Sequence, residues 1–225
     1  MAVRQIFVAG LLILLTGCIT TKSTPDRWAQ LAESERAILV GTVTAELSEP
    51  PMTRYRLSYR NLDTKEEAYI DISTGLNLGF GKRIVAGDAD LEVSGKSVGR
   101  FLEISLPAGR YEFYEVHSTF GGAYIDIDHR SRPFKIPFNV EAGVTYYFGE
   151  LRAYPVIKKD FLGMSQLNGG YFVLRDNRKR DMSFWSKRHP EENADLVRNL
   201  NIDVGSASPL LRHTPMAPFD ATIQQ

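Results

Sequence analysis

The residue best suited to covalent chemistry is Cys18, the only cysteine in a chain of 225 residues. A cysteine thiolate is a good nucleophile, and the small residues Thr16 and Gly17 before it would let an extended backbone enter a modifying enzyme. Because the chain contains no second cysteine, no intramolecular disulfide can form. We therefore expect hydrophobic packing to stabilise the fold unaided.

The segment before Cys18 has the layout of a secretion signal. Arg4 lies close to the N-terminus, and an apolar run from Ile6 to Leu15 follows it. A membrane-spanning helix needs roughly 20 apolar residues, and this run is shorter even when it is extended to Ile19. We expect residues 1–17 to be a signal peptide.

The tetrad Leu15, Thr16, Gly17 and Cys18 resembles the lipobox of bacterial lipoproteins at every position. The resemblance implies that the Cys18 sulfur receives a diacylglyceryl group, that the signal is cut before Cys18, and that the new amine is acylated. One acyl chain binds a membrane only marginally, whereas several hold firmly. The alternative is an ordinary cleavage site with an unmodified Cys18.

The residue after the cysteine indicates in which membrane the lipoprotein is located. In lipoproteins of this kind, an aspartate at that position tends to retain the protein in the inner membrane, and here the position holds Ile19. The resemblance therefore implies an outer-membrane location, with the protein facing the periplasm.

Charge and composition fit one globular domain. Lys and Arg number 27, as do Asp and Glu, and 43% of residues are hydrophobic. Cleavage before Cys18 removes Arg4 and leaves 26 basic and 27 acidic residues in 208, a net charge of about −1. This balance argues against a nucleic-acid partner.

We expect five segments along the chain. They are a signal peptide (1–17), a lipid anchor with polar tether and short helix (18–36), a β-sandwich (37–175), a helical C-terminal extension packed on the sheet (176–205), and an irregular tail (206–225). The short helix should begin with Thr24 as N-cap and Pro25 as its first residue.

Alternating and β-branched runs predict a mainly β fold. The expected strands are 38–47, 55–59, 68–72, 101–106, 110–116, 123–127, 134–140, 145–151 and 171–174. The glycine-rich stretch 75–99 predicts a long connection. Pro107 to Gly109 predicts a hairpin or a sharp corner, and Glu141 to Gly143 predicts a second hairpin.

Two expected strands carry apolar residues on both faces. In 110–117 one face holds Tyr111 and Phe113 and the other holds Tyr114 and Val116, and 145–151 is similar. Such strands are normally covered on both sides. The segment 101–151 resembles the immunoglobulin-like or prealbumin-like sandwich of an uncharacterised family of bacterial lipoproteins, which implies a two-layer β-sandwich and no assigned reaction.

Two helices are expected after the last strand. The first should be capped by Asp176 or Asn177 and should pack Met182 and Trp185 on the sheet, and a second should start at Pro190. The intervening segment 175–189 has an excess of four positive charges, which could meet anionic headgroups or an acidic partner. The simpler interpretation is a solvated helix face.

Other candidate sites are weak. Asp126, Asp128 and His129 have metal-binding side chains, but no further ligand cluster accompanies them, so a polar strand end is the simpler interpretation. No Gly-x-Ser-x-Gly motif supports a hydrolase. Carbohydrate binding would require exposed aromatics such as Tyr111 or Tyr124.

We therefore expect a non-enzymatic envelope lipoprotein that serves as an interaction or structural module. Its partners would be the membrane, through lipid on Cys18, and an envelope protein, and we expect neither cofactor nor metal. A membrane-tethered hydrolase acting on envelope material and a carbohydrate-binding sandwich are the alternatives.

Overall fold

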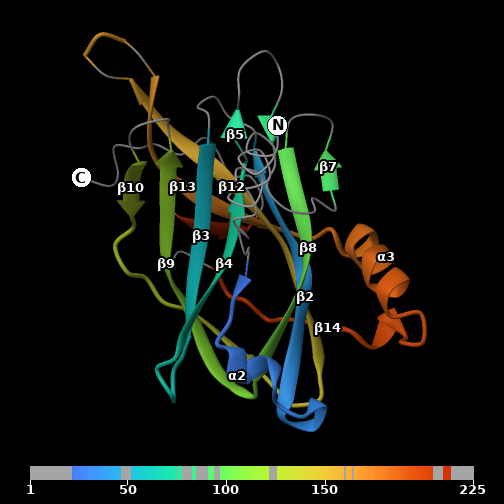
Figure 1. The fold of residues 1–225 in the computed structure, drawn as a ribbon. Coiled ribbons are helices and arrows are strands. Elements are labelled where there is room, and N and C mark those ends of the chain that lie inside the picture. The colour runs from blue at the N-terminus through green and yellow to red at the C-terminus, as the bar shows by residue number, and fades with distance from the viewer. Residues whose placement is uncertain are drawn as a thin grey trace, which may run out of the picture.

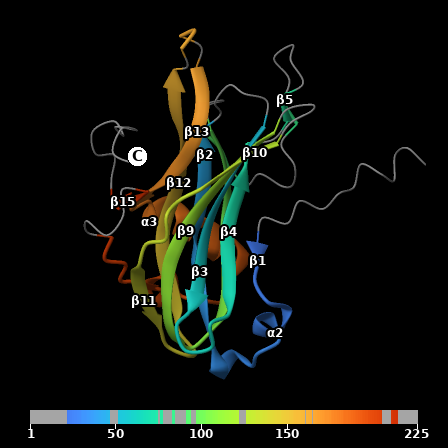
Figure 2. The same ribbon diagram turned by 90° about the vertical axis from the view of Figure 1, so that its left-hand side faces the viewer.

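The computed structural model describes residues 22–46, 52–74, 76–77, 83–84, 91–93, 97–121, 126–159, 161–163, 165–204 and 210–213. The fold is mainly β, with two open sheets facing each other and one helix of 11 residues near the C-terminus (Figures 1 and 2). This confirms the expected class, a mainly β two-layer structure with a short C-terminal helix.

The first sheet has six strands in the order β1-β4-β3-β9-β10, and β11 also pairs with β9. These strands are β1 (Lys22–Ser23), β3 (Met52–Asn61), β4 (Glu67–Ser73), β9 (Gly109–Gly121), β10 (Asp126–Arg130) and β11 (Ile136–Val140). All of its strand pairs are antiparallel.

The second sheet has seven strands in the order β15-β13-β12-β2-β8-β7, and β14 pairs with β12. They are β2 (Arg36–Glu46), β7 (Leu91–Val93), β8 (Ser97–Pro107), β12 (Thr145–Lys159), β13 (Ser165–Arg175), β14 (Arg198–Asn199) and β15 (Leu211–His213). Its centre is mixed, because β2 lies parallel to β12 and antiparallel to β8. A separate pair joins β5 (Leu76–Asn77) to β6 (Arg83–Ile84).

The core lies between the two sheets, and β3 shows how the sequence builds it. Successive side chains of a strand point to opposite faces, so Tyr55, Leu57 and Tyr59 are buried while Arg54 and Arg56 lie on the other face and are only partly buried. Aromatic rings from β9 and β11 join them, with the Tyr111 and Phe138 rings stacked at 5.4 Å. Burial of these rings stabilises the sandwich.

A β-bulge corrects the expectation for β9. The register with β3 passes from Ser58 opposite Glu115 to Tyr59 opposite Phe113, which leaves Tyr114 as an extra residue. The extra residue resets the alternation, so Phe113 and Val116 both face the core. The two apolar faces predicted here are therefore one inner face interrupted by a bulge.

The expectation for β12 is correct, because this strand is covered on both sides. Phe148 packs in the core between the sheets, and Tyr147 packs on the outer side in a second cluster with Val40, Phe101 and Trp185. Trp185 comes from α3 (Arg178–Arg188), which lies on the outer face of the second sheet. The predicted packing of Met182 and Trp185 is thus confirmed.

Both predicted turns are passages between the sheets. Pro107 ends β8 in the second sheet and Gly109 begins β9 in the first, so this turn is a corner, with the Tyr111 hydroxyl donating to the Pro107 carbonyl at 2.8 Å. Glu141 to Gly143 likewise links β11 in the first sheet to β12 in the second, so the second hairpin prediction is wrong. In sequence, a turn between two apolar runs looks the same whether it joins neighbouring strands of one sheet or strands of two different sheets.

Several boundaries also differ from expectation. The first helix, α2, spans only Asp26–Ala29, with Pro25 as its N-cap and no side-chain capping bond, so the predicted Thr24 cap is wrong. The connection at 75–99 contains β5, β6, β7 and the start of β8. The expected tail contains β15, which pairs with β13.

No α-helix starts at Pro190. A turn there is followed by a 3₁₀ helix, η2 (Ala194–Leu196), which Asn193 caps by accepting from the Asp195 amide. Leu196 is exposed, whereas Ala194 and Val197 pack against the cluster that contains Trp185.

Candidate functional site

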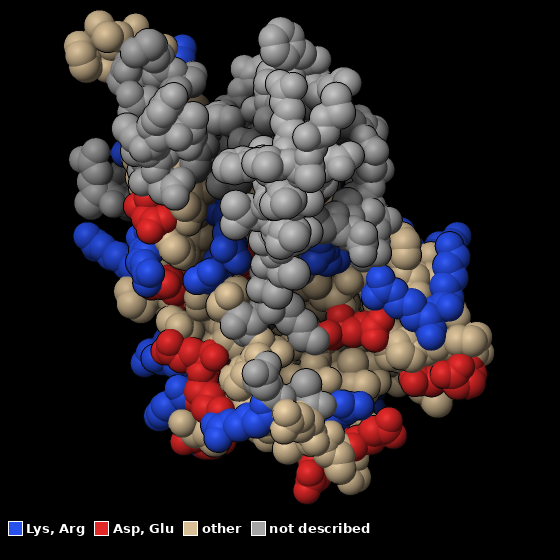
Figure 3. Space-filling view, viewed as in Figure 1, with Lys and Arg blue, Asp and Glu red and all other residues tan. Residues whose placement is uncertain are grey.

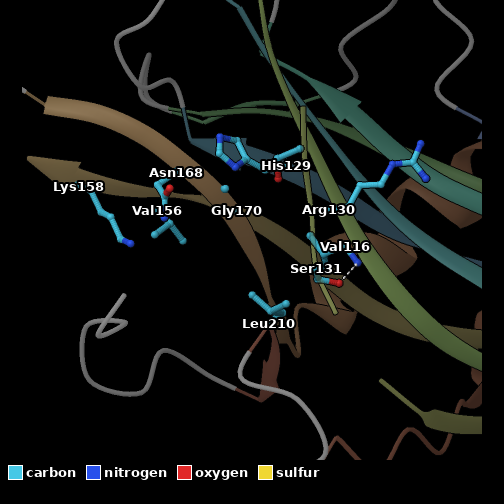
Figure 4. Close-up of a pocket in the computed structure, with 11 residues that line it drawn as sticks. Val116, His129, Arg130, Ser131, Val156, Lys158, Asn168, Gly170 and Leu210 are labelled. Carbon is cyan, nitrogen blue, oxygen red and sulfur yellow. Dashed lines mark hydrogen bonds between the residues drawn. The ribbon is translucent and has the colours of Figure 1, made fainter. Parts of the chain in front are cut away.

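A small cavity opens between the two sheets near the end of the sandwich that carries the β12–β13 hairpin. Its volume is about 130 Å³. Its lining comes from β9, β10, β12, β13 and the Leu210 turn, and Figure 4 shows most of it: Val116, Ser118, His129, Arg130, Ser131, Val156, Lys158, Asn168, Gly169, Gly170 and Leu210. We call it the inter-sheet pocket.

Close backbone approach shapes the floor of this pocket. A Cβ atom on Gly170 would lie 2.5 Å from the Tyr55 ring and 2.8 Å from Ser118 Oγ. Only glycine leaves room for β13 to pack this closely on β3 and β9. Gly170 therefore brings the two sheets together at the pocket.

Six polar residues help to line the inter-sheet pocket: Ser118, His129, Arg130, Ser131, Lys158 and Asn168. Ser118 and His129 are direct cross-strand partners, and the His129 ring lies 5.5 Å from that of Phe120. Ser118 Oγ is buried and has no hydrogen-bond partner among the described residues. In Figure 4 the His129 ring points toward Gly170, whereas the Arg130 side chain points away.

The carboxylate closest in sequence to these groups lies on the opposite face of the strand. Asp128 Oδ1 accepts from Thr119 Oγ1 at 2.8 Å and lies 3.3 Å from His117 Nε2. The Thr119 hydrogen bond, with the neighbouring His117, lowers the pKa of Asp128. Because adjacent residues of a strand face opposite sides, Asp128 does not join Ser118 and His129 in a triad.

The same alternation separates the residues considered for a metal. Asp128 faces outward and His129 lines the inter-sheet pocket, so the two do not converge. The Asp126 side chain lies outside the described residues. A different group, His189, Glu191 and Glu192, could place its ligand atoms within 4.8 Å of one another.

His189 is already engaged by other side chains. Its Nε2 lies 3.0 Å from Glu103 Oε2, its Nδ1 lies 3.5 Å from Glu192 Oε1, and its ring stacks on Trp185 at 3.9 Å. These contacts tie the end of α3 to β8. Glu103 lies far away in the sequence, so the local pattern around His189 could not reveal this arrangement.

The most buried charge of the described chain lies under α3, in a group of side chains that we call the α3 clamp: Thr42, Tyr147, Arg180 and Asp181. Asp181 Oδ2 accepts from the Tyr147 hydroxyl at 2.9 Å and from Thr42 Oγ1 at 3.1 Å, and Arg180 Nε donates to Asp181 Oδ1 at 2.8 Å. Burial raises the pKa of Asp181, and these donors oppose that rise.

Contacts within the protein also explain much of the basic segment. Arg180 binds Asp181 and Thr42, Arg178 donates to the Ala194 and Val197 carbonyls, and Arg188 pairs with Glu103. These arginines bind groups of the protein itself. They form neither a simple solvated face nor a free basic patch.

The residues considered for carbohydrate binding do not form an exposed platform in the described structure. Tyr111 is fully buried and stacks on Phe138. Tyr124 lies outside the described residues, as does the segment with Cys18. None of the described helices is long and apolar enough to cross a bilayer.

The chain matches no protein-family model, and it has no match among curated proteins or solved structures.

Proposed function

We propose that the chain is a bacterial lipoprotein anchored by lipid on Cys18. The observation that carries this proposal is the lipobox tetrad, Leu15 to Cys18, directly after a short apolar run with Arg4 before it. Several acyl chains on one residue hold a protein firmly in a membrane. Ile19 after the cysteine favours the outer membrane, with the domain facing the periplasm.

The body is proposed to act as a non-enzymatic interaction or structural module of the cell envelope. The two-sheet fold is compatible with an immunoglobulin-like or prealbumin-like sandwich of a lipoprotein family. The buried Asp181 of the α3 clamp accepts hydrogen bonds from Thr42, Tyr147 and Arg180, which suits a structural role. An envelope protein is the proposed partner of this module.

A membrane-tethered hydrolase is the second candidate, and one observation favours it. Ser118 and His129 line the same inter-sheet pocket, although no hydrogen bond joins Ser118 Oγ to His129 in the described structure. Catalytic hydrogen bonds are often loose before substrate binds. A hydrolase would lose its activity on envelope material in both Ser118→Ala and His129→Ala, whereas a purely structural module would have none to lose.

The anchor is tested by Cys18→Ser in cells that are fed labelled fatty acid. We expect the substitution to abolish labelling and to leave the precursor uncut, because serine offers no thiol to the lipid donor. The control is Thr20→Ser, which keeps the tetrad intact and should be labelled and cut normally. An unmodified thiol on the mature chain, seen by mass spectrometry, would refute the proposal.

A further inference from the structure

The tip of the β12–β13 hairpin exposes large apolar side chains. Phe161 is 94% exposed and Leu162 is 66% exposed, and Ile157 on β12 is 52% exposed. The hairpin projects beyond the body of both sheets (Figure 1), and in space-filling view its tip forms a protrusion (Figure 3). Exposed side chains of this size at one point commonly mark a binding surface.

The chain enters the fold toward the same end of the molecule. Lys22 pairs with Ile70 and Ser23 with Tyr69 in antiparallel register, so residues before Lys22 lead toward the Ile72 end of β4. Ile72 pairs with Tyr55, and Gly170 of β13 packs on Tyr55. From Gly170 back toward Ser165, β13 runs beside β12 to the exposed tip.

The tether is short compared with this hairpin. Cys18 lies four residues before Lys22, a reach of at most ~14 Å. The distance along the strands from Ile70 to Lys159 can be counted through paired residues. It comprises about two residues of β4, from Ile70 to Ile72, and about four of β12, from Pro155 to Lys159, or roughly 20 Å. A lipid on Cys18 would therefore bring the bilayer within reach of the tip.

The chemistry of the tip fits the interfacial region of a bilayer. Phe161 and Leu162 can enter the boundary between headgroups and acyl chains. Beside them, Lys158 and Lys159 outnumber the single acid Asp160, and this net positive charge suits anionic headgroups. We infer that the β12–β13 tip inserts Phe161 and Leu162 into the membrane that holds the Cys18 lipid, an inference that rests on the proposed anchor.

Because Cys18 would carry lipid, an introduced cysteine is the only free thiol and can be labelled alone. The experiment uses the full chain as lipoprotein in vesicles of phosphatidylethanolamine and phosphatidylglycerol, with a polarity-sensitive dye on Leu162→Cys. The matched control is Ala142→Cys, in the exposed turn at the other end of β12. We expect blue-shifted emission and quenching by nitroxide lipids for the Leu162→Cys chain only.

Further outcomes separate the tip from the anchor. Mass spectrometry of the same sample reports the lipid on Cys18. If the lipid is present and the dye is in water in both labelled chains, only the insertion of the tip is overturned. If the lipid is absent, both the anchor and the insertion of the tip are overturned. Adding Phe161→Ser to the Leu162→Cys chain should reduce quenching. If the emission of the Leu162→Cys chain shifts to the blue in detergent micelles as the protein concentration rises, and transfer to vesicles causes no further shift, the tip contacts a second copy of the chain. That result would overturn membrane insertion.

Discussion

The α3 clamp and the inter-sheet pocket are two polar regions that differ in the hydrogen bonding of their buried groups. In the clamp, Asp181 accepts hydrogen bonds from Thr42, Tyr147 and Arg180, so both of its carboxylate oxygens have partners within the protein. In the pocket, Ser118 Oγ is buried without a partner among the described residues. A satisfied network stabilises a packing arrangement, whereas an unpaired group costs free energy unless something binds it.

The largest effect should come from the apolar side of α3. Trp185→Ala removes a fully buried ring packed on Val40, Phe101 and Tyr147. We expect the free energy of unfolding to fall by about 3–5 kcal/mol, measured by urea denaturation. The control is Lys187→Ala on the exposed side of the same helix, which should change it by less than about 0.5 kcal/mol. Equal effects would show that α3 does not depend on this packing.

Truncating the buried charge should have the next largest effect. Asp181→Ala leaves Thr42 and Tyr147 without their acceptor. We expect a loss of roughly 2–3 kcal/mol in the free energy of unfolding, because buried polar groups left unpaired bear their full desolvation cost. Asp203→Ala, at an exposed position after the helix, is the control. An Asp181→Ala protein as stable as the original would contradict a structural role for the clamp.

The pH dependence of Asp181 refines this prediction. Burial raises the pKa of Asp181 in the folded chain, so below the unfolded value of about 3.9 its protonated form contributes stability. That contribution is lost as pH rises through the higher folded pKa. Compared with Asp181→Asn, which does not titrate, the original chain should therefore lose stability across this window. Parallel stability curves for the two proteins would show that the pKa is unchanged on folding.

The smallest effect should come from the inter-sheet pocket. Ser118→Ala removes a hydroxyl without a partner in the described part of the chain, so the free energy of unfolding should stay constant or rise by up to about 1 kcal/mol. Thr42→Val is the matched change in the clamp, and it should destabilise because Thr42 bonds both Asp181 and Arg180. A similar loss at both sites would end the contrast between the two regions.

The sequence predicted strands well where alternation was regular and failed where geometry changed locally. The alternating runs 55–59 and 134–140 contain or overlap β3 and β11, and Leu57, Tyr59 and Phe138 in them are buried. The bulge at Tyr114 was missed, because an extra residue looks in sequence like a second apolar face. The candidate site was hardly predictable, since Ser118, Asn168 and Gly170 carry no motif and meet only through folding.

By itself, the sequence determined the mainly β class, the positions of most long strands and the buried side of α3, because these depend on local periodicity. Only the tertiary structure decided that the turns at Pro107 and Glu141 pass between sheets, and that Thr42 meets Asp181 across 139 positions. Local patterns specify which side of an element avoids water. They do not specify which distant element covers that side, because many pairings bury the same apolar area.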